Sequence, residues 1–189
     1  MRSLPTLLAR GASAAVYDLG DGTVLKAGIR SLAPIGNAAD HDFLVRAFFL
    51  FERKAYERVG ADPDLSLFTP RYYGPSDEGW RQLVPPPGKL LVEGTGFRIE
   101  KLAGAEEKVG SLPPDLLEIA DNVLIRIKEV MGLADPFDAS AFFPGSRAAV
   151  TVIDFAHWEQ IDASFVSLNR EGTLSAGQRD FVLRLLDAA

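Results

Sequence analysis

Residues 150–157 read V-T-V-I-D-F-A-H, and this stretch decides which fold the sequence predicts. Its first four residues have β-branched side chains, which favour a buried strand. The strand ends in the carboxylate of Asp154, an oxygen ligand of the kind that hard cations such as Mg2+ prefer. The alternative is a strand followed by an aspartate that only caps the next helix. The residues upstream of this stretch favour the first interpretation.

Composition excludes several kinds of site. The chain has 189 residues, enough for one domain or two small lobes. It contains no cysteine, which excludes disulfides, thiolate metal sites and a cysteine nucleophile. Its two histidines exclude a three-histidine zinc site. The net charge of -6 argues against nucleic acid as a partner, because a nucleic-acid surface needs a basic face.

We expect neither a membrane span nor a signal peptide. No apolar run approaches the roughly 18 residues that a membrane-spanning helix needs. The first ten residues resemble a signal peptide only faintly, because their apolar run is broken by Pro5 and stops at Arg10.

Residues 7–26 are expected to form three strands. Small residues at 11–15 separate the first two, and a tight hairpin at Gly20-Asp21-Gly22 precedes the third. Small residues let a backbone approach a ligand closely, and their N–H groups can point at phosphate oxygens. The alternative is a plain pair of hairpins with a tight turn. Residues 29–42 show no clear period, and we expect a loop there.

Apolar periodicity predicts two long helices. The first covers residues 42–60, where apolar side chains recur at three- and four-residue steps until Gly60. The second covers residues 114–131, with a proline in its first turn and an apolar stripe wide enough for a second core. A last amphipathic helix is expected from about Ser175 to Leu186.

The remaining segments are predicted to be short strands and connections. Strands are expected over residues 67–74 and on both sides of a turn at 94–96. The polar, small residues 104–110 are expected to form a linker, and residues 159–174 a loop and a turn.

Taken in chain order, these features resemble a protein kinase. The lysine of the kinase motif V-A-I-K falls on Lys26 in V-L-K, and I-D-F at Asp154 stands where kinases carry D-F-G. The kinase pattern G-x-G-x-x-G-x-V falls on Ala9, Gly11, Ala14 and Val16. The resemblance covers residues from about 7 to 160.

The resemblance implies an α+β, two-lobed, protein-kinase-like fold. Residues 1–103 would form an N-lobe with an antiparallel sheet and one long helix, and residues 104–189 a reduced helical C-lobe. The chain is similar in this respect to the small effector kinases that bacterial pathogens inject into host cells. A protein substrate and a cytoplasmic location, in the host cell for a delivered effector, follow from that similarity.

The resemblance further implies ATP and Mg2+ as cofactors. Lys26 would position the phosphates, held by Glu52 of the long helix; Glu57 lies on a different face, and the spacing favours Glu52. The backbone at Glu100 to Leu102 would bond the adenine edge. The other residues implied to line the nucleotide site are Gly11, Ala12, Ser13, Val16 and Ile99.

Residues 132–155 are the segment that would carry the chemistry. Leu133-Ala134-Asp135 stands at the kinase motif H-R-D, which makes Asp135 the expected base, with Asp138 as the alternative. Ser140 stands where kinases carry asparagine, and would hold the metal together with Asp154. Ordinary turn chemistry around Pro136 is the alternative for both aspartates.

Two further functions fit the same residues. One is a pseudokinase, a nucleotide- or protein-binding module, because the histidine and arginine of H-R-D are replaced. The other is a small-molecule kinase, since inositol polyphosphate kinases commonly carry I-D-F-A-H and the chain also has S-A-F-F at 140–143. Their P-x-x-x-D-x-K-x-G element has no counterpart here.

Overall fold

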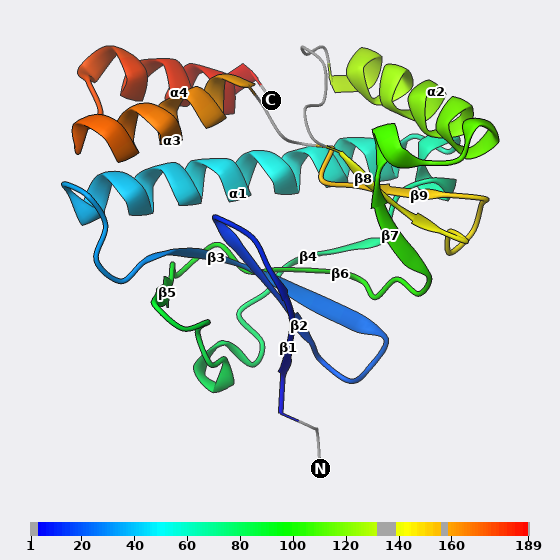
Figure 1. Ribbon diagram of the computed structural model, residues 1–189, viewed down its shortest axis with the longest axis horizontal. Coiled ribbons are helices and arrows are strands. Elements are labelled where there is room, and N and C mark those ends of the chain that lie inside the picture. Colours follow the sequence, from blue (N-terminus) through cyan, green and yellow to red (C-terminus); the bar gives the residue numbers. More distant parts are fainter. Residues whose placement is uncertain (1–3, 132–138, 156–158, 189) are drawn as a thin grey trace. The chain divides into compact units, whose positions relative to one another are not determined.

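The computed structural model describes residues 4–131, 139–155 and 159–188. They form an α+β structure with antiparallel strand pairs and four α-helices, one of them long (Figure 1). Contacts divide the chain into two compact units that alternate along the sequence. The first comprises Met1–Arg53, Tyr73–Ile99 and Gln160–Ala189, and the second Lys54–Tyr72 and Glu100–Glu159.

The first unit is built on a sheet with the strand order β1-β2-β3-β6-β4, in which β5 pairs with β3. Its strands are β1 (Thr6–Arg10), β2 (Ala14–Asp18), β3 (Thr23–Ser31), β4 (Tyr72–Pro75), β5 (Lys89–Leu91) and β6 (Phe97–Glu100). The three strands predicted for residues 7–26 are confirmed, and β3 continues beyond them.

The two faces of this sheet pack against different parts of the first unit. One face forms an apolar core in which Tyr17 also donates a hydrogen bond to the carbonyl of Val84 at 2.8 Å. The residues of this core are Ala15, Tyr17, Leu25, Ala27, Ile29 and Leu83. On the other face, a Cβ at Gly28 would come within 2.6 Å of Val45, so a glycine is needed for the close packing of the helix that carries Val45.

That helix, α1 (Ala38–Ala61), is the long helix predicted for residues 42–60, and it begins four residues earlier. Asn37 caps it, because its side-chain oxygen accepts the N–H of Ala39 at 3.0 Å. The loop predicted for residues 29–42 is wrong at both ends, because β3 continues to Ser31 and α1 begins at Ala38. The sequence interpretation treated Asn37 as a loop residue, whereas it starts a helix.

Two C-terminal helices, α3 (Glu159–Glu171) and α4 (Ala176–Ala188), complete the first unit. The loop predicted across residues 159–171 is wrong: this segment is helical, with Ile161, Ser164 and Leu168 buried along one face. The predicted last helix is confirmed. It starts with a capping box, in which Ser175 N–H donates to Gln178 Oε1 at 2.8 Å and Gln178 N–H donates to Ser175 Oγ at 3.2 Å.

The second unit contains a three-stranded antiparallel sheet, the helix α2 (Pro114–Met131) and the C-terminal end of α1. The strands β7 (Ala105–Lys108), β8 (Ser140–Phe143) and β9 (Thr151–Ile153) lie in that order, and α2 has the predicted bounds. The linker predicted for residues 104–110 is wrong, because residues 105–108 pair with β8. All four β7 side chains are exposed, so the strand shows none of the apolar alternation that would have revealed it.

Candidate functional site

A buried ion pair joins β3 to α1 in the first unit. Lys26 Nζ lies 2.6 Å from Glu52 Oε1, and the two side chains are 9% and 1% exposed. Lys26 is the one charged residue in the buried run Thr23–Ile29 of β3. The structure therefore brings together the lysine and glutamate expected from the sequence, and Glu57 lies exposed on the same helix.

The turn between β1 and β2 lies at the same end of the sheet as Gly28 and Ile29. Gly11 N–H donates to the carbonyl of Ala14 at 2.8 Å, and the carbonyl of Ser13 accepts the N–H of Ile29 at 2.9 Å. The carbonyl of Ala12 accepts Lys89 Nζ at 3.4 Å. Hydrogen bonds to neighbouring strands thus hold this turn. The register of β2 and β3 places Val16 directly opposite Lys26.

Asp154 has an unusual backbone conformation at the end of β9 in the second unit. Its φ is +55°, in the left-handed region that side chains other than glycine rarely adopt. The next residue, Phe155, is buried and meets the ring of Tyr56 edge-on, with a centroid distance of 4.9 Å. The regular strand before Asp154 and the anchored ring after it hold the strained residue in place.

Ser140 lies close to Asp154 along the second sheet. The register of β8 and β9 pairs Ser140 with Ile153, the residue immediately before Asp154, and Ser140 is 2% exposed. The two residues implied to hold a metal are thus neighbours within this unit. Within the described ranges, no group of three or more histidine, aspartate and glutamate side chains is arranged to hold a metal ion. The two candidate bases, Asp135 and Asp138, lie outside the described residues.

An arginine that the sequence interpretation missed organises the segment around Glu100. Arg147 donates to the carboxylate of Glu100 and to the carbonyls of Ser66 and Thr69. The N–H of Glu100 donates to the carbonyl of Arg71 at 2.9 Å. The N–H of Glu100 is therefore occupied by a contact within its own unit, although this residue was expected to offer backbone groups to an adenine.

Of the other residues implied for the adenine segment, Ile99 is buried in β6 and Leu102 is half-buried. No motif in the sequence identifies Arg147. The carbonyls that it contacts belong to residues 78 and 81 positions earlier in the chain, and Glu100 belongs to β6.

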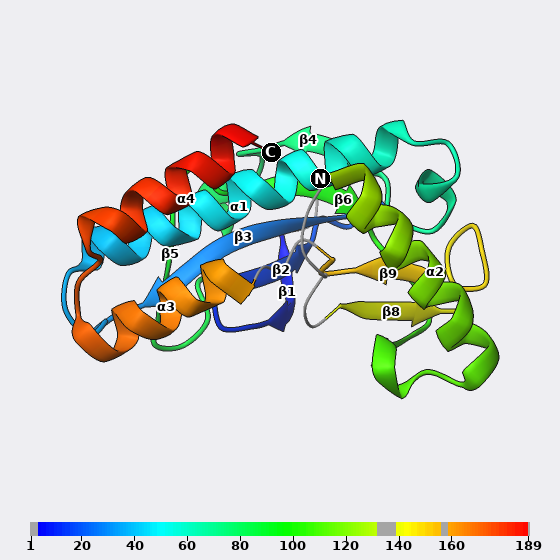
Figure 2. The same ribbon diagram turned by 90° about the horizontal axis from the view of Figure 1, so that it is seen from above.

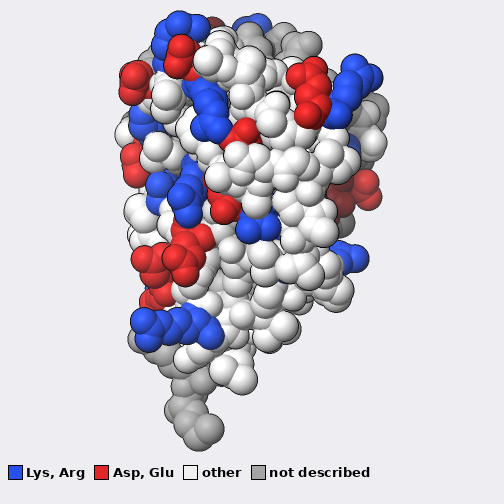
Figure 3. All heavy atoms as spheres, turned by 90° about the vertical axis from the view of Figure 1, so that its left-hand side faces the viewer, with Lys and Arg blue, Asp and Glu red and all other residues white. Residues whose placement is uncertain are grey.

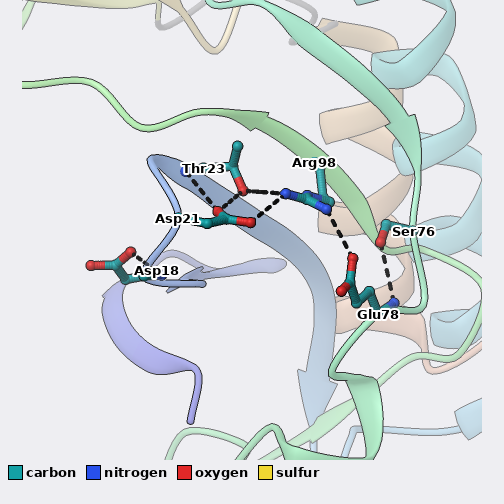
Figure 4. A network of polar contacts seen from close by, with 7 residues as sticks. Asp18, Asp21, Thr23, Ser76, Glu78 and Arg98 are labelled. Atoms are coloured by element: carbon teal, nitrogen blue, oxygen red, sulfur yellow. Dashed lines mark hydrogen bonds and ion pairs between the residues drawn. The ribbon is translucent and has the colours of Figure 1, made fainter. Parts of the chain in front are cut away.

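A second polar network links the β2–β3 turn to β6 in the first unit (Figure 4). Arg98 of β6 donates to Asp21 at 2.7 Å, to Glu78 at 2.9 Å and to the hydroxyl of Thr23 at 2.9 Å. The Thr23 hydroxyl in turn donates to Asp21 at 2.6 Å. The hydrogen bond from Thr23 is the main cause that lowers the pKa of Asp21, and the charge of Arg98 lowers it further.

This network gives a prediction about the pKa of Asp21. Thr23→Val is expected to raise that pKa toward the ordinary carboxyl value, and Arg98→Ala to raise it by less. Because the folded-state pKa is lowered, the stability that ionised Asp21 contributes is present above its unfolded pKa and is lost as the pH falls through its folded pKa. Both variants should therefore lose less stability on acidification than the parent chain.

Carboxyl titrations followed by NMR would measure this, with Asp62 of the second unit as an internal control whose lowered pKa should not change. A larger rise in Arg98→Ala than in Thr23→Val would show that charge, and not the hydroxyl, dominates at Asp21.

No protein-family model matches the chain, and the search of curated proteins found no match. Among the helices of the described ranges, none is both long and apolar enough to cross a membrane. Any functional assignment therefore rests on the geometry of the residues described above.

Proposed function

We propose that this chain is an ATP- and Mg2+-dependent phosphotransferase, a minimal atypical protein kinase with a two-lobed kinase-like fold that acts on serine or threonine hydroxyls. The single observation that carries the proposal is the buried Lys26–Glu52 pair between β3 and α1. In phosphoryl transfer, positioning and charge neutralisation provide most of the catalysis, so a fixed ammonium group is the kind of device that the reaction needs.

The energetics of the pair favour this role over a purely structural one. Removing an ammonium and a carboxylate from water costs several kcal/mol per ion, and apolar side chains of similar volume often stabilise such a position equally well. Fold stability alone therefore gives little reason to keep a lysine in the buried run of β3. A role in which the charge itself acts, such as binding phosphate oxygens, does explain it.

Asp154 and Ser140 are the proposed metal ligands. Mg2+ retains several water molecules and typically takes one or two carboxylates together with substrate phosphates, so Asp154 with Ser140 suits it as a donor set. When bound, Mg2+ neutralises charge on the phosphates. The strained φ of Asp154 supports the proposal, because such outliers are found preferentially at functional sites. Asp135, with Asp138 as the alternative, remains the proposed base.

The experiment is a γ-phosphate transfer assay with labelled ATP and Mg2+, using generic protein acceptors and the chain itself. We expect transfer by the parent chain and none above background for Asp154→Ala. Equal signals from both proteins would reject the phosphotransferase.

A second candidate function is a nucleotide-binding pseudokinase. The observation in its favour is the sequence L-A-D at residues 133–135, where active kinases carry H-R-D. Melting curves with and without ATP and Mg2+ separate the two, because a ligand that binds only the folded state raises the melting temperature. Stabilisation by ATP without any turnover would support the pseudokinase and reject the enzyme.

A further inference from the structure

The turn between α3 and α4 packs tightly against the residues that lead into α1, all within the first unit. A Cβ at Gly36 would overlap the carbonyl of Gly172, and both glycines have φ values of +77°. The carbonyl of Gly172 accepts the N–H of Asn37, the residue that caps α1, at 2.9 Å. Two left-handed glycines thus allow an approach that side chains would prevent.

Asp40 lies at the centre of this junction between the α3–α4 turn and the start of α1. Its side chain is 3% exposed, and its carboxylate accepts the N–H of Leu174 at 3.0 Å and forms an ion pair with Arg179 of α4. Asp40 also lies in the first turn of α1, where a negative charge is favourable to the helix dipole. The guanidinium of Arg179 lies over the ring of Phe43, 5.4 Å from its centroid.

The same helix carries Glu52. Asp40 and Glu52 are twelve residues apart (52 − 40) in one uninterrupted α1, which is roughly 18 Å at about 1.5 Å per residue. Lys26 belongs to the sheet, so the Lys26–Glu52 distance depends on how α1 is rotated and shifted over that sheet. Figures 1 and 2 show α4 running alongside α1, which is the arrangement needed for α4 to hold that helix.

We propose that Asp40 and Arg179 are positioning residues, which act through α1 to hold Glu52 against Lys26. The catalytic consequence rests on the proposed function, whereas the structural consequence for Lys26 does not. The face of the molecule that carries this junction shows positive and negative side chains interspersed around a largely uncharged area (Figure 3). The contact between α4 and α1 joins the Asp40 side chain, which is 3% exposed, to the Arg179 side chain, which is 41% exposed.

The test compares Arg179→Ala with Arg184→Ala, which removes the same charge from an exposed position of the same helix. Two properties would be measured on the full chain by mass spectrometry: amide hydrogen exchange along α1, and the rate at which an acylating reagent labels Lys26. In Arg179→Ala we expect the exchange of residues 49–55 and the labelling of Lys26 to rise by on the order of tenfold, since removing the partner of a buried charged group changes an equilibrium by about that factor.

In Arg184→Ala both should match the parent chain, and Arg179→Lys should lie between. A rise in exchange confined to residues 36–42 and 172–180, with labelling of Lys26 unchanged, would overturn the proposal and leave Asp40 a local contact. Asp40→Asn keeps the shape and an acceptor for Leu174 but removes the charge, so it provides the same comparison if Arg179→Ala does not fold.

Phosphate transfer provides the separate readout for catalysis. If the parent chain transfers phosphate, its rate should fall in Arg179→Ala and not in Arg184→Ala. If no form transfers phosphate but Lys26 becomes more reactive in Arg179→Ala, the positioning role stands and the proposed function fails.

Discussion

Glu52→Leu is expected to destabilise the chain by roughly 3–5 kcal/mol, the typical cost of breaking a buried ion pair by removing one partner. The reason is that Lys26, whose side chain is 9% exposed, would lose the carboxylate that lies 2.6 Å from its ammonium group in a buried position. The double variant Lys26→Met/Glu52→Leu is expected to recover most of that loss, because apolar side chains can fill the same space without a desolvation cost. Urea unfolding curves measure both.

Glu57→Leu is the matched control, since it removes an exposed glutamate from the same helix and should change stability by less than about 0.5 kcal/mol. In the double variant, stability and activity should separate. The folded chain should be stable, but ATP should no longer stabilise it and it should no longer transfer phosphate. A double variant that still binds ATP as the parent does would show that the pair has only a packing role.

Asp154→Gly and Asp154→Ala are both expected to reduce phosphate transfer by about 10²-fold or more, because each removes the proposed metal ligand. They should nevertheless differ in stability, with the glycine variant more stable than the alanine variant by about 1 kcal/mol. Both lack the carboxylate, and they differ in the cost of a left-handed φ of +55°, which glycine adopts without strain. Thermal or urea unfolding of the two variants measures the difference.

The same pair of substitutions at Asp121 is the control. Asp121 is exposed on α2, where glycine is less favourable than alanine by roughly 1 kcal/mol, so the order of stability should reverse. Alanine more stable than glycine at both positions would mean that residue 154 does not adopt the left-handed conformation in solution. Full phosphate transfer by either Asp154 variant would remove this carboxylate from the proposed mechanism.

Much of the fold could be predicted from the sequence because its signals are local. The apolar stripe of residues 114–131, with its proline in the first turn, predicted α2 with the observed bounds. The hairpins around residues 7–26 are equally local, since short turns of small residues determine them. The contact between Lys26 and Glu52 was also expected, although from an ordered resemblance and not from the periodicity of either element.

The tertiary structure alone decided which distant segments meet. The N–H of Leu174 reaches a carboxylate 134 residues earlier, and Arg147 bonds carbonyls 78 and 81 residues away. The contact between Leu174 and Asp40 lies within the first unit, which includes residues 160–189, whereas the sequence interpretation placed these residues with 104–159. Periodicity and caps encode an element through its nearest neighbours, but a partner far along the chain is selected by shape, burial and charge at the contact, which no local pattern records.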